Sequence, residues 1–257
     1  MIILRRTGER RHEQASDREI WLTFDRERGG ADRLAEGFGA LEDLSEGWLS
    51  PGVKSWRHES RDGEVLTYVM DGAVVHSDSE GRSGIMQAGE FGHLAVVHGL
   101  SHSEANASRT VRAHLFRLRF RPPVVDLVNR RQRRRFTAAE RRGNLRVVAS
   151  PDGRRGSLLL QQDAIVFAAL LDPGHHVVHE LRPGRMAWLH IVCGEGFLGD
   201  LVLREGDGVG LANELAVAFT AEEGAELLLI DLDDQTSPHR SAGMGDQQVA
   251  PEHDRHQ

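Results

Sequence analysis

The segment EVLTYVMDGAVVH, residues 64–76, decides the fold class of this chain. Its first seven residues, 64–70, are mainly the β-branched, aromatic and long apolar types that favour strands. Asp71-Gly72 follows, a strong signal for a tight hairpin turn, and residues 73–76 return as a partner strand. The segment therefore predicts an antiparallel β-hairpin.

The same pattern of short apolar segments separated by turn residues extends in both directions from this hairpin. The chain has 28 glycines and only 5% aromatic residues, and its short apolar segments are separated by Gly, Asp-Gly and Pro-Gly pairs. This pattern is typical of an all-β sandwich or barrel. It predicts further strands over residues 91–97, 111–120, 157–160, 164–171, 177–181, 186–192, 208–211, 216–220 and 225–232.

Residues 121–145 interrupt the pattern. Pro122-Pro123 is followed by the arginine-dense stretch 130–135, and Thr137 and Glu140 then have the spacing of a helix capping box. We predict an N-terminal barrel over residues 1–120, a linker with a short helix over 121–145, a second barrel over 146–233 and a disordered tail over 234–257. Because the two halves have similar size and texture, a duplicated barrel is the expected architecture.

Composition limits the classes of function. The formal net charge is −7, so nucleic acid is not an expected partner, and we interpret the arginine run as a solvated face or an interface. Cys193, the only cysteine, lies in an apolar run and is predicted to be a core residue. No stretch approaches the roughly 20 apolar residues of a membrane span. We therefore expect a cytoplasmic protein.

Two short polar motifs carry the candidate chemistry: His58-Glu59-Ser60 and His102-Ser103-Glu104. In a strand, alternate residues point to the same side, so each motif presents its first and third side chains together. His58, His102 and Glu104 form a two-histidine, one-carboxylate set, which is associated with non-heme Fe(II). Ser60 stands where a fourth ligand would be expected.

These segments, taken in order, resemble the pirin family of the cupin superfamily. The likeness extends over nearly all of residues 1–232, and the order and spacing of its motifs make it specific. The segments that carry it are 1–6, 21–24, 37–41, 64–72, 75–79, 88–91, 99–106, 135–136, 150–153, 156–158 and 162–163.

The resemblance implies two stacked barrels, of which the first holds iron or another divalent metal through three histidines and one glutamate, and the second holds none. His58, His102 and Glu104 match three of these ligands, whereas Ser60 falls on the remaining histidine. Residues 54–57 also depart from the family, because they place Trp56 and two cations beside the site.

The departure at Ser60 leaves three outcomes open. His58, His102 and Glu104 could bind the metal alone, with water at the fourth position. A substitute ligand could complete the set, with His98 as the candidate. Alternatively the metal is lost, and His58 and Glu104 act as an acid–base pair. In that case Lys54 or Arg57 would bind an anionic substrate.

The resemblance further implies a quercetinase-like enzyme, a mononuclear-metal dioxygenase that uses Fe(II) on a small aromatic or polyphenolic molecule. Two alternatives come from other classes of function. One is a metal-free isomerase, lyase or cyclase that uses the same interior of the first barrel, and the other is a non-enzymatic regulatory protein that binds a protein partner. Seven further histidines are predicted to be structural: His76, His93, His114, His175, His176, His179 and His190.

Overall fold

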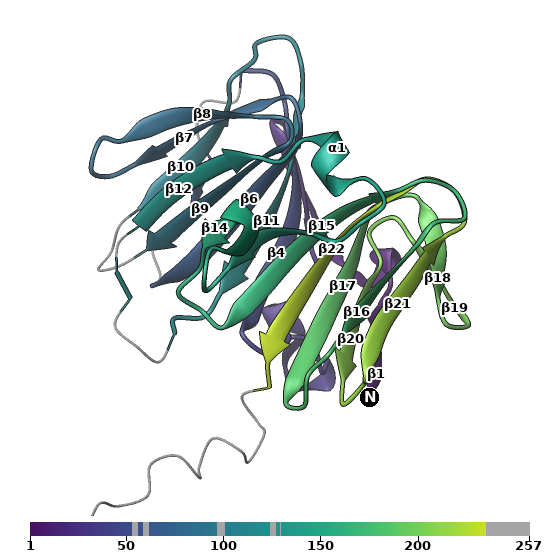
Figure 1. Cartoon of the computed structure of the whole chain (residues 1–257). Helices are drawn as coiled ribbons and strands as arrows, with labels where there is room; N and C mark the ends of the chain where they lie inside the picture. The colour runs from purple at the N-terminus through teal and green to yellow at the C-terminus, as the bar shows by residue number, and fades with distance from the viewer. Residues whose placement is uncertain (53–55, 59–61, 97–100, 124–126, 129, 235–257) are drawn as a thin grey trace, which may run out of the picture.

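The computed structural model describes residues 1–52, 56–58, 62–96, 101–123, 127–128 and 130–234, with the backbone alone for 56–58 (Figure 1). Strands dominate the described residues, which confirms the predicted all-β class. No helix among these residues is long and apolar enough to cross a membrane. The predicted tail, apart from Asp234, lies outside the described residues.

Up to residue 135, the described residues form twelve strands. They are β1 (Ile2–Arg5), β2 (Arg11–Gln14), β3 (Arg18–Leu22), β4 (Leu41–Leu49), β5 (Trp56–His58), β6 (Gly63–Asp71), β7 (Ala73–Asp78), β8 (Ser83–Gln87), β9 (Glu90–Val96), β10 (His102–Asn106), β11 (Ala113–Phe120) and β12 (Arg130–Arg135). Short 3-10 helices cover Thr7–Glu9 and Arg26–Ala31.

The second half begins with the short helix α1 (Ala138–Arg141), capped by Thr137 and Glu140 as predicted. Its strands are β13 (Arg146–Ser150), β14 (Leu158–Leu159), β15 (Ala164–Leu171), β16 (His176–Glu180), β17 (Arg185–Cys193), β18 (Glu195–Leu198), β19 (Leu201–Arg204), β20 (Gly208–Ala212), β21 (Ala216–Ala221) and β22 (Ala225–Asp233). A 3-10 turn covers Arg154–Gly156.

Each half pairs a seven-stranded sheet with a four-stranded sheet. In the first half the orders are β12-β9-β6-β11-β4-β3-β2 and β5-β10-β7-β8. In the second half they are β1-β20-β17-β22-β15-β13-β14 and β16-β21-β18-β19. Among the strands that the structure describes, all pairings are antiparallel except that of β13 with β14.

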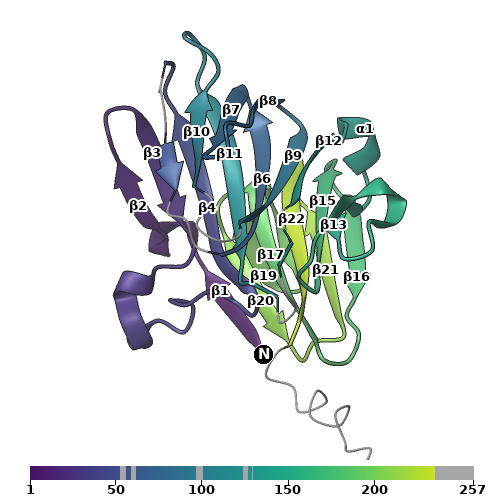
Figure 2. The ribbon, with the colours of Figure 1, turned by 90° about the vertical axis from the view of Figure 1, so that its left-hand side faces the viewer.

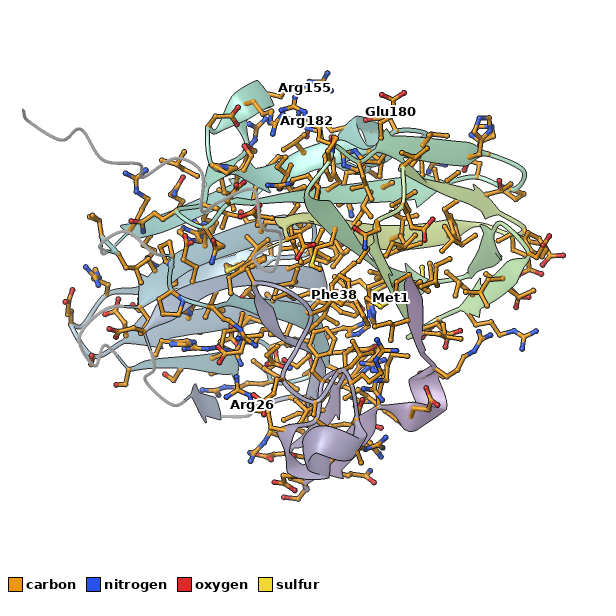
Figure 3. All side chains as sticks on the ribbon, turned by 90° about the horizontal axis from the view of Figure 1, so that it is seen from below. Met1, Arg26, Phe38, Arg155, Glu180 and Arg182 are labelled. Atoms are coloured by element: carbon orange, nitrogen blue, oxygen red, sulfur yellow. The ribbon has the colours of Figure 1, made fainter. Side chains whose placement is uncertain are left out.

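The two large sheets pack face to face in the middle of the molecule (Figures 1 and 2). Buried Leu66 and Phe116 of the first sheet belong to one apolar cluster with Trp188 and Ile230 of the second. Phe38 lies between the halves (Figure 3), and its ring centroid is 5.6 Å from that of Trp188. Apolar burial between the sheets thus joins the two barrels.

The two faces of strand β11 contact different parts of the molecule. Phe116, Leu118 and Phe120 belong to the cluster between the halves. Because side chains alternate along a strand, the intervening residues face the interior of the first barrel. Ala113 and Leu115 pack there against Val74. Arg117 takes the next interior position and is only 8% exposed.

The structure places the arginine run in a strand, where its side chains are exposed or half-buried. Residues 130–135 form strand β12, which pairs with β9 at the edge of the first large sheet, so they are not part of a linker. Strand β1 pairs with β20 and therefore lies in the sheet of the second half. Edge pairings of this kind depend on contacts between segments distant in sequence.

Candidate metal and substrate site

Strand β10 lies between β5 and β7 in the small sheet of the first barrel. His102, Glu104 and Asn106 are buried, whereas Ser103 and Ala105 between them are half-buried. The alternation places the first and third residues of the second motif on the face that points into the barrel, as strand geometry requires. The backbone register sets residue 58 of β5 directly opposite His102.

Arg117 meets this pair of side chains from the opposite sheet. Its Nη2 lies 3.2 Å from Nε2 of His102, and its Nε lies 3.6 Å from a carboxylate oxygen of Glu104. A guanidinium has only donors, so Nε2 of His102 accepts this hydrogen bond and carries no proton. Hence one cationic group contacts both the imidazole and the carboxylate of the motif.

Thr67 adds a further polar contact to Glu104 in the interior of the first barrel. It lies opposite Arg117 in the register of β6 and β11, and its hydroxyl donates a 3.1 Å hydrogen bond to Glu104. The Glu104 side chain is 2% exposed. Because its other oxygen faces Arg117, the carboxylate is held between a hydroxyl and a cation, which stabilises its ionised form.

His76 faces the same interior from β7, where it is the register partner of Glu104. Its ring centroid is 5.7 Å from that of His102, and its Nε2 has no hydrogen-bond partner among the described residues. Burial lowers the pKa of this imidazole below its usual value, while Glu104 opposes the effect. His76 is therefore neutral at physiological pH, and Nε2 is left for a ligand.

A cavity of about 300 Å³ opens beside His102 and His76. Val65, Met86 and Leu94 supply an apolar lining, and Arg131 is also part of the wall. Arg131 lies 3.6 Å from the carboxylate of Asp78, which also pairs with Arg82 at 2.8 Å. An apolar cavity with a few polar groups is the usual form of a small-molecule site.

Several predicted residues are not placed by the structure. Lys54, Ser60 and His98 lie outside the described residues, and Arg57 and His58 are described by their backbone alone. Where side chains are described, no three His, Cys, Asp or Glu form a group that could hold a metal. The observed donor pair is therefore His102 with Glu104, and His58 enters only through its register position.

The donor pair is compatible with a metal. A metal bound to imidazole takes the lone pair of a neutral nitrogen, and a carboxylate is a common second ligand. Both acceptors of the motif already contact one cationic side chain, so they converge on a position where positive charge is favoured. The residue types fit a divalent metal held by His102, Glu104 and His58.

Sequence reasoning missed Arg117 and Thr67 and treated His76 as structural. The available signal was the alternation in β11, where arginine occupies every second position after Leu115. The segment 111–120 was predicted as a strand, and its arginines were given no role. In the structure, the face that carries Arg117 lines the barrel interior, where this residue is 8% exposed.

Other predicted structural histidines have carboxylate partners. His93 lies 2.7 Å from Glu64, and His114 lies 2.8 Å from Glu46. In the second barrel, His179 lies 2.7 Å from Asp231, which also accepts a 2.7 Å hydrogen bond from Arg185. His190 is different, because neither ring nitrogen has a partner among the described residues.

Comparison with known proteins identifies the family. The family model for Pirin matches residues 33–118, and the model for the quercetinase C-terminal cupin domain matches residues 147–232. Quercetin 2,3-dioxygenase of Escherichia coli K12 is 33% identical over 232 residues, which cover 90% of this chain and 99% of the relative. The chain belongs to the pirin family.

Pirin relatives support the two-barrel cupin architecture predicted from sequence. The crystal structure of the bacterial pirin YhhW from Escherichia coli in complex with nickel(II) superposes with a TM-score of 0.82 at 32% identity, over 91% of this chain and 99% of that one. A pirin-like protein of Caulobacter vibrioides is 29% identical, over 76% of this chain and 84% of the relative. Among these relatives, one is named as a dioxygenase and one was crystallised in complex with nickel(II).

Proposed function

We propose that this pirin is a metal-dependent dioxygenase of the quercetinase type that acts on a small aromatic or polyphenolic molecule. The convergence of His102 and Glu104 on one cation position, beside a partly apolar cavity, carries this proposal. The 33% identical relative named quercetin 2,3-dioxygenase supports the reaction class.

His58, His102 and Glu104 would hold the metal, and Fe(II) is the metal we propose. When bound, the metal would supply the Lewis acidity and redox capacity that reaction with dioxygen requires. Thr67 orients Glu104 through its hydroxyl, and fixing a ligating carboxylate in this way preserves the geometry of a site.

The cavity would bind and orient the organic substrate. Val65, Met86 and Leu94 present apolar surface suited to a planar ring. Nε2 of His76, without a partner among the described residues, would accept a hydrogen bond from a phenolic hydroxyl. Arg131 would attract a phenolate. These groups favour an aromatic substrate that carries acidic hydroxyls.

A metal-free catalyst in the same cup is the second candidate. The contact of Arg117 with Glu104 favours it, because the carboxylate already has a cationic partner. In this case His76 and Glu104 would move protons, and Arg117 or Arg131 would hold an anionic substrate. A small molecule in the same cavity is common to both proposals.

The test is dioxygen consumption with quercetin, using untagged protein loaded anaerobically with one equivalent of Fe(II). We expect turnover that stops with a chelator and returns with Fe(II). The rate of dioxygen consumption should fall at least about 100-fold in Glu104→Gln. Glu180→Gln, at an exposed position of β16 in the second barrel, is the matched control and should keep full activity. Turnover that resists the chelator would favour the metal-free candidate, and no turnover with flavonols would overturn the proposed substrate class.

A further inference from the structure

We propose that Arg117 is a built-in competitor of the metal: its guanidinium holds the position on His102 and Glu104 that a divalent cation would take. The inference rests on the proposed function, because it concerns the same site. It implies that the metal affinity of this chain is set by Arg117 as well as by its ligands.

The first step of the argument is the lone pair on His102. Its Nε2 accepts a hydrogen bond from Nη2 of Arg117 at 3.2 Å. An unprotonated imidazole nitrogen has one lone pair in the ring plane, and a metal bound to that nitrogen needs the same lone pair. Hydrogen bonding to Arg117 and metal ligation through Nε2 therefore exclude each other.

The second step concerns charge. The Arg117 and Glu104 side chains are 10% and 2% exposed, and they approach to 3.6 Å. In such a buried setting, two positive charges within a few ångströms repel strongly, because little water screens them. A divalent ion at Glu104 would have to share its carboxylate with Arg117 or displace the guanidinium.

The third step is position. The backbone of Arg117 is fixed at an interior site of β11, between Ser45 of β4 and Thr67 of β6. A charged side chain at the edge of a barrel could turn to solvent, but this residue is only 8% exposed. The guanidinium is therefore held in the cup by the same pairing that builds the sheet.

The experiment measures metal affinity directly. Untagged protein is titrated with Ni(II) in air and with Fe(II) under anaerobic conditions, by calorimetry, for the parent, Arg117→Gln and Arg117→Met. We expect both neutral variants to bind metal about tenfold or more tightly than the parent, since a nearby positive charge is removed. Arg117→Lys, which keeps the charge, should not show this gain.

Two controls make the measurement specific. Arg119→Gln removes an arginine two residues further along β11 that pairs with Glu42, and its metal affinity should equal that of the parent. The double variant Arg117→Gln with Glu104→Gln should lose the gain, because it lacks the carboxylate ligand. Thermal unfolding of each protein, with and without metal, verifies folding and provides a second readout of binding.

Equal affinity of the parent and both neutral variants would overturn the competitor role and leave the proposed metal site standing. A gain that persists without Glu104 would also overturn it, because the metal would then bind elsewhere. Absence of binding in the parent and in every variant would overturn both the inference and the metal-dependent function.

Discussion

The hydroxyl of Tyr68 on β6 donates a 2.5 Å hydrogen bond to Glu226 on β22, across the junction of the two barrels. Arg141 of α1 contacts the same carboxylate at 2.5 Å and the Tyr68 oxygen at 2.9 Å. All three residues are at most 6% exposed. The trio is a buried polar cluster at the junction, and its members supply hydrogen bonds to one another.

Removing the Tyr68 hydroxyl should weaken this junction. In Tyr68→Phe the carboxylate loses one of its partners, and we expect the free energy of unfolding to fall by about 1–3 kcal/mol. Urea unfolding at pH 7 measures the change. Arg141→Met should cost more, about 3–5 kcal/mol, because it leaves a buried carboxylate without its cation. Equal losses in the two variants would contradict this ranking.

The buried His190 should make stability depend on pH. Burial, assisted by the charge of Arg10, lowers its pKa to about 3. The unfolded state binds a proton at His190 below pH ~6.5, whereas the folded state excludes it. The contribution of His190 to the pH dependence is therefore fully favourable to folding above that pH and is lost as the pH falls towards 3. His190→Leu should lose less stability than the parent between pH 7 and pH 4, measured by urea unfolding.

The same variant should be more stable at pH 7. Neither ring nitrogen of His190 has a hydrogen-bond partner among the described residues, and an unpaired buried polar group costs about 1–3 kcal/mol. His175→Leu, at an exposed position, is the control and should leave the acid profile unchanged. A parent and His190→Leu with parallel pH profiles would show that His190 does not cause the acid sensitivity.

Glu46 should contribute to acid stability in a lower pH window. Burial by itself raises its pKa, but hydrogen bonds from His114 and Arg10 outweigh burial and bring the pKa to about 2. The stabilisation is present above pH ~4.5 and is lost as the pH falls towards 2. Glu46→Gln should be less stable than the parent at pH 6 by about 3 kcal/mol, with a difference that shrinks below pH 4.5.

His76 should affect substrate binding more than folding. Its Nε2 lacks a partner among the described residues and its ring lines the cavity beside His102. We expect His76→Leu to raise the KM or Kd for a hydroxylated aromatic by about tenfold, the effect of one lost hydrogen bond, with little change in Tm. Binding of a flavonol followed by fluorescence tests this, and His175→Leu is the matched control. Unchanged affinity would place the substrate hydroxyls elsewhere.

Local sequence signals predicted much of the framework. The hairpin formed by β6 and β7 follows from its strand-forming residues and from Asp71-Gly72, where Gly72 adopts a φ of 73°. The predicted segments 164–171, 216–220 and 225–232 agree with β15, β21 and β22 within one residue. These segments have strong periodicity and clear turns, so short-range chemistry is enough to define them.

Segments with weaker local signals were not predicted as strands. The arginines of β12 have no apolar alternation, and their strand exists because β9 offers a free edge to pair with. Strand β1 was similarly left unassigned, and it pairs with β20, about two hundred residues away. Such pairings require the rest of the barrel to be in place.

For the candidate site, too, one part could be predicted from the sequence and the other depends on the tertiary structure. The period of a strand was sufficient to place His102 and Glu104 on one face, because neighbouring side chains alternate regardless of what surrounds them. Arg117 could be assigned to a polar face of its strand on the same ground. Only the tertiary structure decided that this face is the inside of the barrel, since closing the small sheet over the large one brings His102 and Arg117, fifteen residues apart, to 3.2 Å. The period of a strand defines its faces, but the packing of sheets determines which face is buried and which cation the motif meets.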